Sequence, residues 1–450
     1  MTQQGVRWTA DQVLALAPDS TSRKAGSKLG TADPWSGTGS SPEGAVWGLC
    51  EGSGSLPYRT VVDTAGGTGP AYRCTCPSRR FPCKHALGLL LLWSGGEGAM
   101  PAGRAPDWAE QWIAGRRRTQ EEREAGPAGS VGGPADPEGA RRRAERRAER
   151  ITSGATELEE RLTDLLRSGL ATAEQSGYGL WEETAARMVD AQAPGLAARV
   201  RELGSVPASG PDWPVRLLEE CALLHLLDQG WLHRELLPDA LAVTVRARVG
   251  LPSSPVGPPV RDHWLVLAQY DRQDPKLTTR RIWLYGTTSG RTALLLSYGA
   301  AGRAPEITLP VGLVLDAELS AYAGAGQQRA ALGEQFAPPA PTGTRPPGTT
   351  TTEATARYGE ILRHDPWQDS VPVTLNAVIP TPDGDSWQLA DAEGDTALPL
   401  TPAALSRPGL WRLVALSGGA PVRVFGECGH RGFTPLTAWP TGEGEAVRLC

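Results

Sequence analysis

The feature that most constrains this chain is a short stretch in which three cysteines and one histidine follow one another closely. Cys74 and Cys76 are separated by one residue, six residues follow, and Cys83 and His85 are again separated by one. Three thiolates and one imidazole form a complete ligand set for tetrahedral zinc. Because the protein would supply all four ligands, we expect a structural Zn²⁺ site with no position for a reactive water. We therefore predict that this site is not catalytic.

The spacing also predicts the local structure. Side chains that share one face of a helix lie three or four residues apart, so Cys74 and Cys76 are expected on a strand end or a turn. Pro82 is suited to the first turn of a helix that begins around Cys83 and His85. Two alternatives remain open: a disulfide with one free thiol, or a C-x-C redox pair with His85 capping the helix.

This pattern, with Lys84 between the last two ligands and an apolar helix behind it, resembles a bacterial SWIM-type zinc finger. The segments 47–54 and 57–58 resemble the lead into such a finger, and the resemblance covers roughly residues 1–113. It implies a zinc-chelating module that binds DNA or other proteins. It also implies a possible partner, because bacterial members are often encoded beside a MoxR-type AAA+ ATPase and a von Willebrand factor A (VWA) protein.

Charge limits how the chain can bind nucleic acid. The formal net charge of the 450 residues is −5, so there is no basic excess to drive unspecific binding to a polyanion. Any DNA contact must be local. We predict a basic rim around the finger that contacts nucleic acid or a partner, with nearby aromatic residues available for stacking, although ordinary solvated charge is the alternative. The rim consists of Arg73, Arg79, Arg80 and Lys84, with Arg59 beside it, and the aromatics are Tyr58, Tyr72 and Phe81.

The other cysteines and the hydropathy pattern bear on location. Cys50, Cys221, Cys428 and Cys450 are too scattered to indicate a disulfide framework, and zinc thiolates require reduced sulfur. No apolar run approaches the ~20 residues that cross a bilayer. We therefore expect a cytoplasmic protein with no membrane contact. Phosphate-loop, nucleophile-elbow and HExxH patterns are absent, so we predict that the chain is not an enzyme, with a site hidden in the β-rich half as the remaining alternative.

The length predicts several domains. We expect an α+β multidomain protein with a small zinc-stabilised α+β N-terminal domain, a helical middle and an antiparallel β-rich C-terminal half. The predicted order is a SWIM zinc-finger domain (1–113), a charged Gly/Pro-rich linker (114–150), a helical domain (151–240), an antiparallel β-rich domain (241–337), a Pro/Thr-rich linker (338–371) and a small β-barrel-like domain (372–450). An OB-like barrel is one candidate for the last of these.

Individual elements follow from local patterns. Thr9 and Gln12 form a capping box at the start of a short helix. The run 141–150 predicts a solvated helix with internal salt bridges, and Cys221 with His225 is interpreted as core packing rather than as a metal pair. Breaks are expected at Gly177 and Pro194. Strands are predicted at 45–49, 58–62, 71–73, 263–270, 280–286, 292–298, 373–379, 387–389, 397–400, 411–416 and 422–425, and further helices at 20–29 and 215–232.

Two functions follow from these patterns. In the first, the finger docks a protein and the downstream domains assemble with it. In the second, the finger and its basic rim bind DNA. The acidic net charge slightly favours docking.

Overall fold

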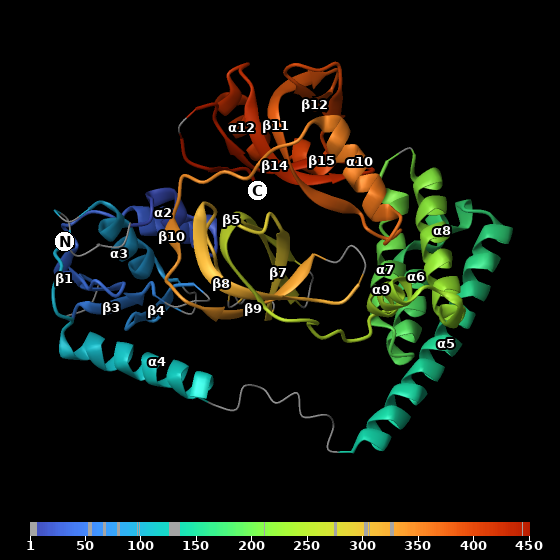
Figure 1. Ribbon diagram of the computed structural model, residues 1–450, viewed down its shortest axis with the longest axis horizontal. Helices are drawn as coiled ribbons and strands as arrows, with labels where there is room; N and C mark the ends of the chain where they lie inside the picture. Colours follow the sequence, from blue (N-terminus) through green and yellow to red (C-terminus); the bar gives the residue numbers. More distant parts are fainter. Residues whose placement is uncertain are drawn as a thin grey trace.

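The computed structural model describes residues 7–52, 56–65, 69–78, 82–96, 98, 100–125, 136–210, 212–273, 277–300, 305, 307–324, 328–442 and 444–450. Four units lie along the chain (Figure 1): an N-terminal α+β unit, a helical bundle, a first β-barrel and a second β-barrel near the C-terminus. In Figure 1 the blue N-terminal unit and the green bundle flank the yellow first barrel, and the orange and red second barrel lies above them. The predicted α+β fold class is confirmed.

The N-terminal unit packs helices on a small antiparallel sheet. Its elements are α1 (Ala10–Leu14), α2 (Ser20–Ser27), β1 (Trp35–Ser40), β2 (Ala45–Cys50), β3 (Tyr58–Asp63), β4 (Ala71–Cys74) and α3 (Lys84–Ser94), with strand order β1-β2-β3-β4. The capping box of Thr9 and Gln12 is confirmed. The sequence did not predict β1, because its Gly, Ser and Thr residues give little β signal.

Much of the segment predicted as a linker is helical. The helix α4 (Asp107–Ala125) crosses into it, and α5 (Pro137–Ser168) begins within it. One predicted salt bridge within the 141–150 run is confirmed, since Arg141 lies 3.0 Å from Glu145, and Arg142 lies 3.9 Å from Glu138 just before the run. Such pairs one turn apart support a solvated helix.

The bundle consists of α5, α6 (Ala171–Asp190), α7 (Pro194–Leu203), α8 (Trp213–Leu232) and α9 (Asp239–Val249), with 3₁₀ turns at Val206–Ala208 and Arg234–Leu236. Pro194 starts a helix as predicted, but the break predicted at Gly177 is wrong, because α6 runs through it. A helical glycine costs only about 1 kcal/mol, which packing can offset. The helical unit extends to Val249, beyond the predicted limit at residue 240, because α9 packs into the same core.

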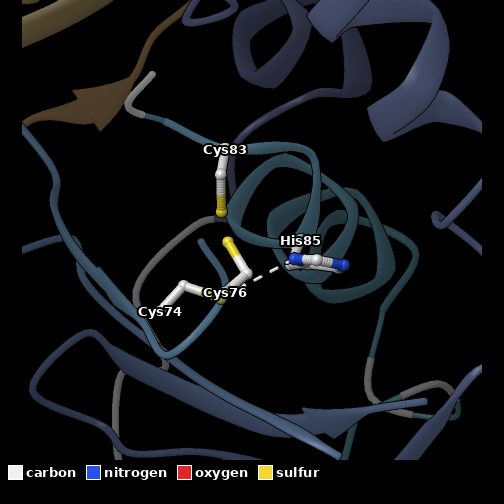
Figure 2. Close-up of side chains that lie close together, drawn as sticks. All are labelled: Cys74, Cys76, Cys83 and His85. Atoms are coloured by element: carbon white, nitrogen blue, oxygen red, sulfur yellow. Dashed lines mark hydrogen bonds between the residues drawn. The ribbon is translucent and has the colours of Figure 1, made fainter. Parts of the chain in front are cut away.

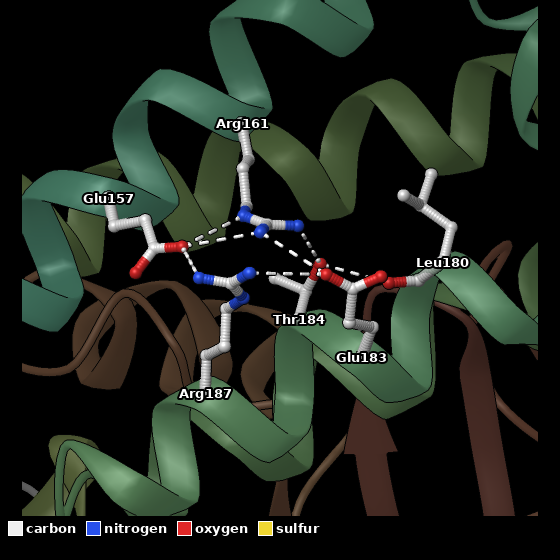
Figure 3. Close-up of polar contacts among 6 residues, drawn as sticks. All are labelled: Glu157, Arg161, Leu180, Glu183, Thr184 and Arg187. Carbon is white, nitrogen blue, oxygen red and sulfur yellow. Dashed lines mark hydrogen bonds and ion pairs between the residues drawn. The ribbon is translucent and has the colours of Figure 1, made fainter.

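Charged residues join α5 to α6 on the outside of this core (Figure 3). Arg187 lies 2.8 Å from Glu157 and 3.4 Å from Glu183, and Arg161 lies 3.2 Å from Glu157 and 3.6 Å from Glu183. Arg161 also donates a hydrogen bond to the Thr184 hydroxyl. Four alternating charges therefore link the two helices on their solvent side.

The first barrel contains β5 (Val260–Gln273), β6 (Leu277–Gly286), β7 (Thr292–Ala300), β8 (Leu313–Ala321) and β9 (Arg329–Gln335), and β10 (Ala340–Pro341) extends its edge at β8. The predicted antiparallel meander of β5, β6 and β7 is confirmed. The strand β8 pairs with β5, and β9 pairs antiparallel with β8 and parallel with β7. These pairings close a five-stranded barrel.

The second barrel repeats this strand order. It contains β11 (Ser370–Asp383), β12 (Ser386–Asp391), β13 (Ala397–Pro399), β14 (Val422–Gly429) and β15 (Gly432–Trp439), with β16 (Val447–Arg448) at one edge. The third strand approaches the fifth in parallel through the bridge between Leu400 and Phe433. The result is a partly open five-stranded barrel, which agrees with the predicted OB-like barrel.

One predicted strand of this barrel is wrong. Residues 411–416 lie in the helix α12 (Gly409–Ser417), which follows α11 (Pro402–Leu405) between the third and fourth strands. The reason is periodicity: the buried positions Leu410, Leu413 and Ser417 are three or four residues apart, which is the helical repeat. A further helix, α10 (Thr351–Leu362), lies within the segment predicted as a Pro/Thr-rich linker and begins with a capping box of Thr350 and Glu353.

The units share cores. One hydrophobic cluster joins buried residues of α3, such as Leu90, to barrel residues such as Trp264 and Ile282. A second cluster joins the two barrels, for example through Leu265 and Phe425. The finger unit therefore packs directly on the first barrel, and the first barrel packs on the second.

Candidate metal centre

The four predicted ligands converge at the junction of β4 and α3. Cys74 is the last residue of β4 and Cys76 follows in the turn, while Cys83 is the N-cap of α3 and His85 is in its first turn. One ligand atom from each residue lies within 4.8 Å of all the others (Figure 2). Ligands bound to zinc at about 2.0–2.3 Å lie about 3.3–3.8 Å apart, so a small contraction would enclose one ion.

Neighbouring residues fix the orientation of these ligands. The Nδ1 atom of His85 lies 3.7 Å from the Cys74 sulfur, and the Thr60 hydroxyl lies 3.3 Å from the same sulfur. The Tyr58 ring packs against the His85 ring with 4.8 Å between their centroids. Cys83 and His85 are only 2% and 4% exposed. Such supporting contacts hold metal ligands in place and restrict solvent access.

The sulfurs are electrostatically coupled. The hydrogen bond from Cys83, with smaller contributions from the hydrogen bonds to His85 and Thr60, lowers the pKa of Cys74 to about 3 against the opposing effect of burial. The same bond to Cys74, together with burial, raises the pKa of Cys83. The cluster thus stabilises a thiolate at Cys74 first, and a bound cation would favour the other two thiolates.

A fifth cysteine lies near the cluster but does not join it. Cys50, at the end of β2, is fully buried, and burial raises its pKa to about 11. Its thiol contacts the carbonyl oxygen of Glu51. All seven cysteines are free thiols. The structure therefore contains no disulfide among Cys74, Cys76 and Cys83.

A cleft of about 500 Å³ opens beside the cluster, between α2 and the finger. Its lining includes Thr21, Ser22 and Ala25 of α2 and the ligands Cys76, Cys83 and His85. The rest of the lining includes Leu29, Glu51, Tyr58 and Lys84. The cleft is missing from the sequence prediction, because it forms only where α2 packs against α3.

The predicted rim is described only in part. Arg73 and Lys84 are exposed beside the cluster, whereas Arg79 and Arg80, like Phe81, lie outside the described residues. Tyr58 packs on His85, and the Tyr72 hydroxyl is buried with no hydrogen-bond partner among the described residues. The Tyr72 hydroxyl therefore faces inward, whereas the Tyr58 ring packs on His85 and also lines the cleft. Contact through Arg73 and Lys84 stays a prediction.

Comparison with known families agrees with this geometry. Residues 69–93, which contain all four ligands, match the model of the SWIM zinc finger. The chain carries a SWIM zinc finger. Residues 146–249 match the SWIM-associated four-helix bundle domain, which corresponds to most of α5 and to α6 through α9. No curated protein and no solved structure matches the chain.

The finger and its ligand chemistry together indicate Zn²⁺ as the bound metal. The bundle was predicted as a helical unit, but its association with SWIM fingers was not. The matches carry no information on the source, so the bacterial resemblance stays a prediction. Among the described residues, no helix has the length and apolar character needed to cross a membrane.

Proposed function

We propose that this SWIM protein is a zinc-dependent adaptor that docks a protein segment in the cleft beside the finger. The observation that carries the proposal is the chemistry of that cleft. Its lining combines apolar contacts from Ala25, Leu29 and Tyr58 with a base, Lys84, and an acid, Glu51. A lining with both charges and apolar side chains suits a peptide segment better than a polyanion, which Glu51 would repel.

The bundle supplies a second argument for a protein partner. Three apolar side chains on α8 are turned to solvent: Val215, Leu218 and Leu226 are 61%, 49% and 45% exposed. Val215 and Leu218 are three residues apart, and Leu226 follows two helical turns later, so all three lie near one face. Clustered exposed apolar residues favour a protein contact over a nucleic-acid contact.

The zinc in this proposal is structural. Four protein ligands leave no open coordination position, so the metal would shape the cleft rather than activate water. We therefore propose a non-enzymatic role. A MoxR-type AAA+ ATPase or a VWA protein is the partner that the family resemblance suggests. DNA binding through Arg73 and Lys84 is the alternative, because both cations are exposed beside the metal site.

The test is a binding titration with two purified candidates, the MoxR-type ATPase encoded nearest to this chain and a DNA duplex. We expect the ATPase to bind and Lys84→Glu to weaken it about tenfold, a loss typical of one charge-assisted contact. The matched control is Lys28→Glu, because Lys28 is exposed at the end of α2 but does not line the cleft. Zinc content is measured in both variants first.

Two outcomes would contradict docking in the cleft. One is ATPase binding that Lys84→Glu leaves unchanged. The other is binding to the DNA duplex alone, with a salt dependence that flattens by about one unit for each of Arg73→Ala and Lys84→Ala.

A further inference from the structure

A second cavity lies far from the finger in sequence, where the first barrel meets α10. Its volume is about 430 Å³, which is within the usual range for small-molecule sites. Apolar side chains form much of the lining, including the buried Trp264, together with Val260 and Leu319. Three arginines also line it: Arg291 before β7, Arg329 at the start of β9, and Arg357 on α10.

No described residue supplies a counter-charge to these three arginines. Among the described residues, the side chains of Arg291, Arg329 and Arg357 form no ion pair and no hydrogen bond with another described residue. By contrast, Arg261 and Arg280 on the same barrel are each paired with an aspartate, at 2.8 Å and 2.7 Å. Like charges that line one small cavity repel one another, and an anion bound between them would offset this repulsion.

The cavity wall is held in place without using the arginines. The buried carboxylate of Asp262 accepts hydrogen bonds from the backbone N–H groups of His263, Thr288 and Ser289 at 2.6–3.1 Å. This fixes the turn that leads to Arg291. The Arg329 guanidinium lies 4.2 Å above the Tyr322 ring, a stacking contact that leaves its edge N–H groups able to donate.

One polar atom in the wall also lacks a partner. Gln328 lines the cavity, and its Oε1 is buried with no hydrogen-bond partner in the described part of the chain. A buried acceptor of this kind is costly unless a donor reaches it. The cavity thus combines three donors for an anion, one acceptor for a hydroxyl or amino group, and an apolar surface for a ring.

From this combination we infer that the cavity between the first barrel and α10 binds a phosphate-bearing small molecule of about mononucleotide size. Arginine suits phosphate because its planar group donates two parallel hydrogen bonds. The three arginines converge on one cavity and do not follow an extended groove, which favours one phosphate group over the backbone of a nucleic-acid strand. Because Arg357 belongs to α10 and the other two arginines belong to the first barrel, the ligand would also link α10 to the first barrel.

The experiment is calorimetric titration of the full chain with AMP, with pyrophosphate, and with adenosine as the ligand that lacks phosphate. We expect AMP and pyrophosphate to bind and adenosine to bind at least about tenfold more weakly. Arg357→Gln should weaken AMP binding by about tenfold or more, and Arg329→Gln should do the same. The control is Arg363→Gln, since Arg363 is exposed at the end of the same helix and pairs with Glu360 outside the cavity.

Three results would overturn the inference. The first is no saturable binding of AMP or pyrophosphate at ligand concentrations up to about 10 mM, which would place the Kd above the millimolar range. The second is an AMP affinity that Arg357→Gln and Arg363→Gln change equally. The third is an oligonucleotide of about twelve nucleotides that binds far more tightly than AMP, which would indicate an extended strand site. Arg357 is exposed, so loss of folding does not explain a loss of binding in its variant.

Discussion

Asp228 is an acidic residue in an environment that opposes its charge. It lies on α8 with no exposed surface, and both carboxylate oxygens lack hydrogen-bond partners among the described residues. Its neighbour Glu159 already accepts hydrogen bonds from His225 at 2.6 Å and from Gln229 at 2.9 Å. Burial, and then the charge of Glu159, raise the pKa of Asp228 from 3.8 to about 9. The folded bundle therefore holds Asp228 as the neutral acid.

This predicts how bundle stability depends on pH. Between pH 3.8 and about 9 the folded state keeps a proton that the unfolded state has lost, so the contribution of Asp228 to stability is greatest below pH 3.8 and falls as the pH rises. Asp228→Asn removes this dependence and should stabilise the bundle at pH 8 by a few kcal/mol, on the order of the shift. Chemical denaturation followed at several pH values tests it, with the exposed Asp164→Asn as control. A variant as sensitive to pH as the unaltered chain would contradict the assignment.

Among the structural elements, those specified by residues close together in the sequence could be predicted from it. The four zinc ligands lie within twelve consecutive positions, so the site was predictable in full. The capping box of α1 and the apolar runs of β5 and β6 are also local. The cleft beside the zinc was not predictable, because α2 and the finger form it together. The fifth strand β15 was missed because its glycine and proline weaken the β signal, which pairing with β14 overrides.

The contact between the two barrels depends on one buried acid. Glu427 on β14 accepts hydrogen bonds from the Tyr270 hydroxyl at 2.7 Å and from the Trp283 ring N–H at 2.9 Å, and Arg281 lies 3.6 Å away. Replacing it with Ala removes the acceptor of the buried Tyr270 hydroxyl and Trp283 ring N–H, and the counter-charge of Arg281.

We therefore predict that Glu427→Ala destabilises the barrel pair by about 3–5 kcal/mol, the usual cost of breaking a buried pair. The exposed Glu393→Ala is the control and should change stability by less than about 0.5 kcal/mol. Urea denaturation measures both. Equal midpoints for the two variants would show that this network does not hold the barrels together.

For the whole molecule, the shared core between α3 and the first barrel means that the zinc site is not an isolated appendage. Loss of the metal should loosen α3, and the barrel residues that pack on it, such as Trp264 and Ile282, should lose protection as well. The bundle has a separate core and should be unaffected.

Hydrogen exchange of Cys83→Ser, read by mass spectrometry, tests this prediction. Exchange should rise in the finger unit and in residues 260–335, while residues 137–249 keep the protection of the unaltered chain. Faster exchange in the finger unit alone would show that the finger and the barrel unfold independently.

The central claim is that Cys74, Cys76, Cys83 and His85 hold one structural zinc. Elemental analysis of the full chain, purified under reducing conditions without added metal, tests it most directly. The account predicts about one zinc per chain, which is lost in Cys83→Ser and retained in Cys50→Ser, because Cys50 lies outside the ligand set. Zinc-free protein with Cys74, Cys76 or Cys83 in a disulfide, or equal zinc content in the two variants, would contradict it.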